Sequence, residues 1–311
     1  MLGISALDKC LHYYSLENTP KAFAYTKYFL GHAYLFHAQA NYDNPTINLN
    51  NAIMAFEEAL KFFTHEYDPL MFANIKNNLG VVYVGLSDYL NPLTNLDSAK
   101  TAHKEALNNY SKESTPLEYA QTQCYLGHAY NLTAMQKESP AKNLKKAKEL
   151  LSDALIFITP EQDSFWYSIT QADLGAVYGL LADYEDRINN LENSGTAAKE
   201  TLRFLDNESN PLRYGRALYN LGLSFRKIAD YKNKIENLRL AMRAFETALP
   251  YFEHINYQQD LMDTHVELGN SLLRLAQIGV DRKLIENAEF REYLNKARDS
   301  FRQLGSVDIS I

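Results

Sequence analysis

The 311-residue chain is poor in cysteine and in basic residues. Cys10 and Cys124 are its only cysteines, so they supply neither a disulfide framework nor the clustered thiolates of a cysteine-based zinc site. Lys and Arg number 31 against 38 Asp and Glu, which gives a formal net charge of −7. Because dedicated nucleic-acid-binding domains normally carry a basic face, this balance argues against a nucleic-acid partner.

Long apolar runs are missing as well. Residues 1–15 follow an amphipathic pattern in which Asp8, Lys9 and His12 interrupt the apolar positions. A secretory signal needs a basic start and an unbroken apolar stretch of roughly 7–15 residues. No segment approaches the roughly 20 apolar residues that a membrane-spanning helix needs. We therefore expect a cytoplasmic protein without a membrane partner.

The sequence also lacks motifs that carry common chemistry. Its eight histidines form neither a His-Glu-x-x-His motif nor a two-histidine-carboxylate spacing, and it has no phosphate-binding loop and no Gly-x-Ser-x-Gly motif. His32 and His128 occupy equivalent repeat positions, where polar side chains of an inner surface are a better interpretation than metal ligands. We therefore predict no catalytic residue, no metal and no cofactor, and a protein that is not an enzyme.

A glycine recurs along the chain at a nearly constant period. Six of the 13 glycines, each preceded by a leucine, lie at intervals of 49, 47, 48, 47 and 47 residues: Gly31, Gly80, Gly127, Gly175, Gly222 and Gly269. Glycine costs about 1 kcal/mol relative to alanine in a helix interior. Its recurrence inside helical patterns predicts that another helix approaches closely at each of these positions.

Each of these register glycines belongs to the predicted first helix of a repeat. A capping residue followed by proline precedes four of them, in Thr19-Pro20, Asp68-Pro69, Thr115-Pro116 and Asn210-Pro211. The first residue of such a pair is suited to cap a helix N-terminus, and proline is favoured at the first helical position. Glu118 would complete a capping box with Thr115.

The predicted second helix of each repeat carries an alanine, a large residue four positions later, and then Ala-Leu. The spacing is that of one helical face, and it is clearest in Ala52-Phe56-Ala59-Leu60 and Ala241-Phe245-Ala248-Leu249. Asparagines precede this pattern, where we expect them to cap the second helix: Asn48, Asn95, Asn143, Asn190 and Asn237. Pro45, Pro92 and Pro140 should break the chain between the two helices of the first three pairs.

Because one helix pair cannot bury its own apolar face, the pairs are expected to stack. The predicted fold class is an all-α, right-handed α-solenoid of antiparallel helix pairs. Residues 1–17 match a second helix and form a half repeat, and six pairs follow at 18–66, 67–113, 114–159, 160–208, 209–255 and 256–305. We expect a single solenoid over 1–305 and a frayed tail at 306–311.

These patterns resemble the tetratricopeptide repeat (TPR), whose first helix reads Trp-x2-Leu-Gly-x2-Tyr and whose second reads Ala-x3-Phe-x2-Ala. Leu-Gly-x2-Tyr is kept four times, ending at Tyr34, Tyr83, Tyr130 and Tyr178, and we expect these tyrosines to pack helices. The Trp position holds other residues, and the period is longer than the usual 34 residues. The long repeats look like bacterial TPR arrays found beside caspase-like (CHAT) or other signalling domains.

The TPR resemblance implies that the first helices line a concave groove that holds a partner. Transferred to this sequence, the predicted binding residues are Tyr25, Tyr28, His32, Phe36, Asn74, Asn77, Gln121, His128, Asn131, Arg216, Tyr219, Arg226, Lys227, Asn270 and Arg274. The start of this groove is aromatic, its middle is rich in amides and its far end is cationic. An acidic part of a peptide would pair with the cations, although a solvated cationic helix face explains them equally well.

The function favoured by these expectations is a non-catalytic protein–protein interaction scaffold that holds a peptide or a partner segment in the concave groove. The alternative is a regulatory receptor for a small ligand or signalling peptide whose binding alters the curvature of the solenoid. Self-association through the apolar face of the N-terminal half repeat is a further expectation.

Overall fold

The computed structural model describes residues 2–40, 44–253, 257–281 and 288–306, and every regular element in these ranges is an α-helix. The helices are α1 (Leu2–Cys10), α2 (Pro20–Gln39), α3 (Pro45–Leu60), α4 (Pro69–Ser87), α5 (Pro92–Leu107), α6 (Pro116–Met135), α7 (Pro140–Ala154), α8 (Ser164–Leu181), α9 (Arg187–Phe204), α10 (Pro211–Ile228), α11 (Lys234–Glu253), α12 (Gln258–Asp281) and α13 (Ala288–Ser306). Residue 306 ends α13, and the rest of the predicted frayed tail lies outside the described residues. None of the helices described is long and apolar enough to span a membrane.

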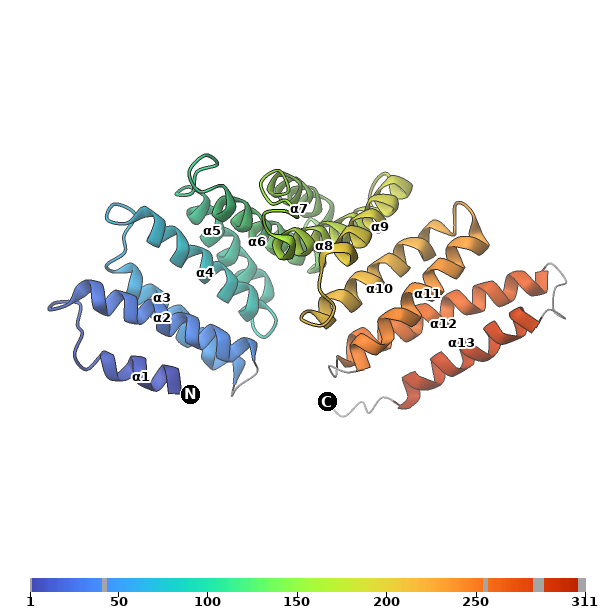
Figure 1. Cartoon of the computed structure of the whole chain (residues 1–311), viewed down its shortest axis with the longest axis horizontal. Coiled ribbons are helices and arrows are strands. Elements are labelled where there is room, and N and C mark those ends of the chain that lie inside the picture. Colours follow the sequence, from blue (N-terminus) through green and yellow to red (C-terminus); the bar gives the residue numbers. More distant parts are fainter. Residues whose placement is uncertain (1, 41–43, 254–256, 282–287, 307–311) are drawn as a thin grey trace. The chain divides into compact units, whose positions relative to one another are not determined.

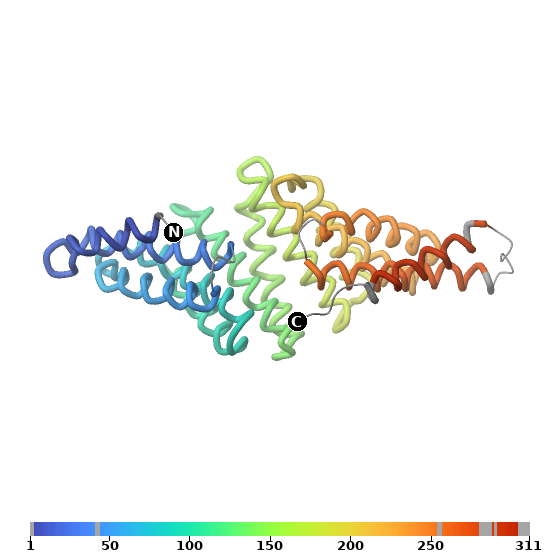
Figure 2. The backbone as a smooth tube through the Cα atoms, turned by 90° about the horizontal axis from the view of Figure 1, so that it is seen from below, coloured from blue at the N-terminus to red at the C-terminus, as the bar shows by residue number. Residues whose placement is uncertain are grey.

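The chain forms two compact units, Met1–Phe157 and Ile158–Ile311. The first holds α1 and the pairs α2/α3, α4/α5 and α6/α7, and the second holds α8/α9, α10/α11 and α12/α13 (Figure 1). The two helices of each pair lie side by side along most of their length, as the backbone trace shows (Figure 2). The single solenoid over 1–305 stays a prediction.

Within each unit the pairs stack in sequence order. The second helix of a pair packs on the first helix of the next pair, at α3/α4 and α5/α6 in the first unit and at α9/α10 and α11/α12 in the second. First helices also contact one another, at α4/α6, α8/α10 and α10/α12. Because successive second helices in the described residues do not approach to the same extent, the first helices form an inner row. The predicted all-α solenoid of stacked helix pairs is confirmed.

The register glycines lie where the second helix of the same pair approaches most closely. A Cβ atom placed on Gly31 would lie 2.6 Å from the Phe56 ring, and one on Gly222 would lie 2.5 Å from the Phe245 ring. Both phenylalanines are fully buried. Gly175 is the most relaxed, since its nearest neighbour would be the Ala197 side chain at 3.3 Å. The predicted close helix approach at the glycines is confirmed, and at Gly31, Gly80, Gly127 and Gly222 a large buried side chain of the facing helix lies against the glycine.

The predicted caps of the first helices are only partly correct. Asp68 accepts a hydrogen bond from the Met71 backbone N–H at 3.0 Å, as a cap should. Thr19 and Thr115 make no such bond, so the capping box predicted for Thr115 and Glu118 is wrong. Their hydroxyls instead accept a backbone N–H four residues earlier, at Ser15 for Thr19 and at Ser111 for Thr115. Asn210 also lacks a side-chain capping bond.

The second helices begin earlier than predicted. Pro45, Pro92 and Pro140 are the first residues of α3, α5 and α7, because proline needs no hydrogen-bonded N–H there. The predicted cap asparagines therefore lie inside the first turn. Four of them donate instead from Nδ2 to the carbonyl five residues earlier, at 2.5–2.8 Å: Asn95 to Leu90, Asn143 to Glu138, Asn190 to Glu185 and Asn237 to Lys232. These bonds close the turn between the paired helices.

Candidate functional site

In the first unit, a cluster of polar and aromatic side chains links two helices of the inner row, α2 and α4. Nδ2 of Asn78 on α4 lies 3.3 Å from Nε2 of His32 on α2, and the Asn78 side chain also hydrogen-bonds Tyr28. The Tyr28 and His32 rings meet edge to face, with their centroids 4.6 Å apart. Burial lowers the pKa of His32, which favours its neutral form. Tyr28 and His32 thus belong to the contact between neighbouring first helices.

Three predicted groove residues contact the second helix of their own pair or the residues just after it. The Asn74 side-chain oxygen accepts a hydrogen bond from the Tyr110 hydroxyl at 2.7 Å. Oδ1 of Asn77 lies 2.8 Å from Nδ1 of His103 on α5, and Tyr25 packs edge to face on Phe63, just after α3, at 4.9 Å between centroids. These side chains are committed to packing within the helix pair, which limits what they can offer to a partner.

Helix α2 exposes a row of aromatic side chains. Phe36 is 63% exposed and Phe29 is 52% exposed. Phe29 precedes His32 by three residues and Phe36 follows it by four, so the three side chains share one face of α2. Because exposed aromatic side chains are frequent anchors at protein interfaces, this row is the part of the predicted groove best suited to contact a partner.

The predicted residues of the third pair lie on α6. Gln121 and His128 are half-buried, whereas Asn131 is only 5% exposed. Burial raises the pKa of Asp88 at the end of α4, and His128 partly offsets that rise, so the two groups interact across neighbouring first helices. A side chain as buried as Asn131 contributes little to a surface contact.

In the second unit, each predicted groove cation is paired with a carboxylate on or just after a neighbouring first helix. The pairs are Arg216–Asp260 at 2.8 Å, Arg226–Glu267 at 2.5 Å, Lys227–Asp183 at 3.3 Å and Arg274–Asp230. Three of these pairs join residues that are 44 positions apart. The cations expected to receive an acidic peptide are therefore already neutralised by the chain itself.

The remaining predicted residues of the second unit differ in what they contact. Tyr219 packs on the α11 phenylalanine Phe245 with 5.7 Å between the ring centroids, and burial raises its pKa. Asn270 is half-buried on α12. Burial also raises the pKa of Glu267, while Arg226 and Lys227 lower it. The inner row of this unit is therefore a set of compensated charges and packed aromatic rings.

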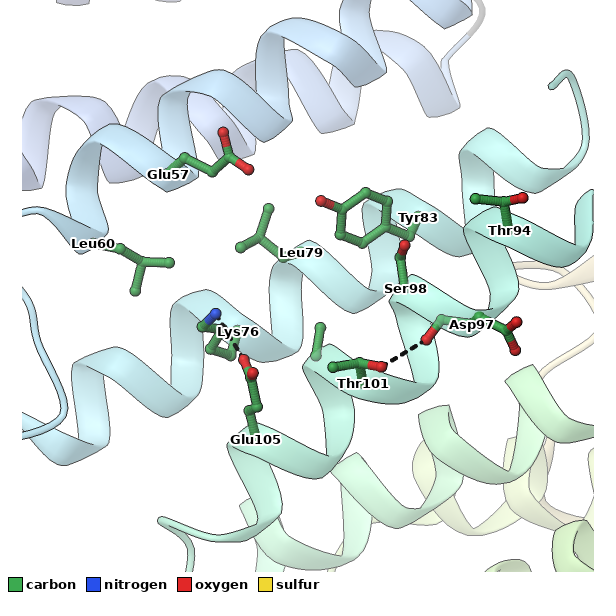
Figure 3. A pocket seen from close by; sticks show the side chains of 11 residues that line it. Glu57, Leu60, Lys76, Leu79, Tyr83, Thr94, Asp97, Ser98, Thr101 and Glu105 are labelled. Atoms are coloured by element: carbon green, nitrogen blue, oxygen red, sulfur yellow. Dashed lines mark hydrogen bonds and ion pairs between the residues drawn. The ribbon is translucent and has the colours of Figure 1, made fainter. Parts of the chain in front are cut away.

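Sequence reasoning missed a pocket of about 480 Å³ on the side of the first unit where the second helices lie. It opens between α3 and α5 and has α4 as its floor (Figure 3). Lys76 and Glu105 form an ion pair across it at 2.7 Å. The Tyr83 hydroxyl points toward the α3 side of the pocket, where Glu57 lies (Figure 3).

A second pocket, of about 380 Å³, lies between α1, α2 and α3 and repeats the first one. Asp8, Lys27, Leu30 and Tyr34 line it, and adding 49 to each number gives Glu57, Lys76, Leu79 and Tyr83 of the larger pocket. Glu57 lines both pockets, so they adjoin. Lysine and tyrosine recur at these two repeat positions in both repeats, and this recurrence was the signal in the sequence for the two pockets.

In the described part of the chain, no group of three or more His, Cys, Asp or Glu side chains is arranged to hold a metal ion. Neither cysteine forms a disulfide, and Cys124 is buried in α6 while Cys10 is half-buried at the end of α1. The first unit offers two candidate contact surfaces, the inner row of first helices and the two adjoining pockets on the side of the second helices.

The stacked helix pairs define the class of the fold, and comparisons with known proteins find structures similar to it. A crystal structure of BtubC (BKLC) from P. vanneervenii resembles this chain with a TM-score of 0.51 and 15% identity, over 85% of this chain and 93% of that one. A circular tandem repeat protein with a novel repeat topology matches 98% of this chain and 76% of its own length, at 11% identity and a TM-score of 0.29. No family model and no curated protein matches the sequence. The chain is a helical repeat protein of the α-solenoid class.

Proposed function

We propose that the protein is a non-catalytic interaction scaffold, and that it holds a segment of a partner polypeptide against the inner row of first helices in the first unit. The observation that carries this proposal is the exposure of Phe29 and Phe36 on the face of α2 that also carries His32. The assignment of the repeats to the TPR family, from Leu-Gly-x2-Tyr and Ala-x3-Phe-x2-Ala, is part of the same proposal.

The partner segment that fits this surface is mainly apolar. Two exposed phenylalanines lose water when an apolar side chain covers them, and that gain is roughly 25 cal/mol per Å² of buried apolar area. The inner-row cations of the second unit are already paired, Arg216 with Asp260 and Arg274 with Asp230. We therefore place no acidic requirement on the segment that binds the first unit.

Selection from a random peptide library on the immobilised full chain tests the proposal. Selected peptides should contain apolar or aromatic residues, and their dissociation constants should rise about tenfold or more for Phe36→Glu, since an anchor is replaced by a charge. Ile156→Glu is the matched control, because Ile156 is 70% exposed and follows a second helix, α7. Peptides that bind Phe36→Glu as tightly as the unaltered chain would refute the inner-row site.

A further inference from the structure

The two adjoining pockets place an acidic residue beside a half-buried tyrosine in the same way. Burial raises the pKa of Tyr34, and Asp8 raises it further. For Tyr83 the causes are burial and then Glu57. Both hydroxyls therefore remain protonated at neutral pH, and each ring stays uncharged beside a carboxylate.

In two of the four later repeats the acidic position is filled by lysine, whereas Ser152 and Glu246 hold it in the other two. Lys104 corresponds to Glu57 and Tyr130 to Tyr83, each 47 residues later, and the Lys104 Nζ lies 5.6 Å from the centre of the Tyr130 ring. In the second unit Lys199 lies over Phe225 at 5.5 Å. That pair corresponds to Lys104 and Tyr130, each 95 residues later. An ammonium group over the ring is thus the arrangement that these repeats adopt when the chain supplies the cation.

The first two repeats leave that place open and surround it with negative charge. Three carboxylates and one lysine line each pocket: Asp8, Glu57, Glu58 and Lys27 in one, and Glu57, Asp97, Glu105 and Lys76 in the other. Lys76 is engaged by Glu105, Asp97 by Lys100 and Glu58 by Lys61. Among the described residues, Asp8 and Glu57 have no cation within ion-pair distance.

We propose that this groove, the outer acidic groove lined by Asp8, Tyr34, Glu57 and Tyr83, binds a basic segment of a partner polypeptide whose Lys or Arg side chains enter the two pockets. Each cation would contact a tyrosine ring, as Lys104 contacts Tyr130. It would also contact a carboxylate of the groove. A cation over an aromatic ring contributes about 0.5–2 kcal/mol, and an exposed ion pair about 0–1 kcal/mol. The groove is distinct from the inner row, so this proposal does not depend on the proposed function.

Fluorescence anisotropy with the full chain tests the groove. The probes are labelled peptides of about twelve residues that alternate lysine with serine, and a counterpart with glutamate in place of lysine. The lysine peptide should bind with an affinity that falls as salt rises, and the glutamate peptide should not bind. Equal binding of both peptides, or no binding of the lysine peptide at low salt, would overturn the proposal.

Three variants locate the binding. Glu57→Gln should raise the dissociation constant about five- to tenfold, because Glu57 lines both pockets. Glu57→Lys recreates the arrangement of Lys104 and should abolish binding while the fold is kept. Glu17→Gln removes the same charge from an exposed site between α1 and α2 and should change nothing. Binding that is equally weakened by Glu17→Gln, or unaffected by Glu57→Lys, would overturn the groove as the site.

Free polyamines carry the same charge as lysine side chains, so spermidine is added as a competitor. Spermidine is used at a concentration that supplies as much positive charge as the lysine peptide. If the groove is a polypeptide site, spermidine should displace little of the bound lysine peptide. Full displacement would assign the pockets to small cations and overturn the polypeptide assignment. Phe36→Glu should leave lysine-peptide binding unchanged, which separates this outcome from that of the inner-row test.

Discussion

Lys227 on α10 lies 3.3 Å from the carboxylate of Asp183, which follows α8. Each residue of this pair has an equivalent 47 positions later, Arg274 and Asp230, and these also form an ion pair. The same link therefore joins first helices at α8/α10 and at α10/α12. The cations predicted to form one end of the groove therefore contribute to contacts between neighbouring repeats of the second unit.

Reversing one charge of this link should destabilise the protein. Lys227→Glu places two carboxylates together, and we expect it to lower the free energy of unfolding by about 1 kcal/mol, since both side chains are partly exposed. The double variant Asp183→Lys, Lys227→Asp should recover most of the loss. Urea unfolding followed by circular dichroism measures both effects.

Arg213→Glu is the control for this reversal, because Arg213 is an exposed residue of the same helix. It should change stability by less than about 0.5 kcal/mol. A double variant no more stable than Lys227→Glu would show that the pair does not couple the repeats.

The register glycines should differ in how they tolerate alanine. In Gly222→Ala the new Cβ would lie 2.5 Å from the fully buried Phe245 ring, and such overpacking costs about 1–3 kcal/mol. In Gly175→Ala the nearest neighbour would be at 3.3 Å, so the helix preference for alanine, about 1 kcal/mol, offsets most of the strain.

Thermal unfolding of the two alanine variants, measured side by side, checks this difference. Phe245→Leu combined with Gly222→Ala should restore part of the loss, because Gly127 already faces a leucine, Leu151, at the looser distance of 3.0 Å. Equal melting temperatures for Gly222→Ala and Gly175→Ala would contradict the packing account.

His103 should make stability depend on pH. It occupies the place that Phe56 and Phe245 hold in other pairs, and burial, with a smaller effect of His128, lowers its pKa to about 3. The unfolded chain takes up a proton near pH 6.5, whereas the folded chain does so only near pH 3. The contribution of His103 to the free energy of unfolding therefore falls as the pH drops from about 6.5 toward 3.

His103→Phe removes this proton uptake and should flatten the pH dependence over the same window. Urea unfolding at several values between pH 7 and pH 4 gives the difference between the variant and the unaltered chain. His37→Phe serves as the comparison, because His37 lies on a first helix, α2, and is only half-buried. A difference between His103→Phe and the unaltered chain that does not grow as the pH falls would contradict the account.

The sequence was sufficient to predict the repeat and the residues at its closest contacts. Glycine, alanine and proline recur with a period of 47 to 49 residues because they are needed where helices approach closely or begin. The same helix approach and helix starts recur along the chain, so the period reveals them. The exact helix starts were harder to predict, because Pro92 and Pro140 act as first helical residues although they also fit a break between helices. Asn95 and Asn143 were consequently predicted to cap α5 and α7, although they lie inside the first turn of these helices.

Side-chain direction limited the prediction of the binding surface. Asn74 and Asn77 lie at the boundary between the face of α4 that packs on its own pair and the face that belongs to the inner row. A small rotation of the helix about its axis decides which of the two faces carries them. The ion pairs between residues 44 apart depend on how far neighbouring helices are offset along their axes. That offset is a property of packing, and the 47-residue period alone does not contain it.

Photocrosslinking of a selected peptide tests the inner-row scaffold most directly. A benzophenone amino acid is placed at position 36, on the exposed face of α2, or at position 156, after α7, and the crosslinked products are mapped by mass spectrometry. The account predicts crosslinking from position 36, and its loss when unlabelled peptide is added in excess. Crosslinking only from position 156, or equally from both positions, would contradict it.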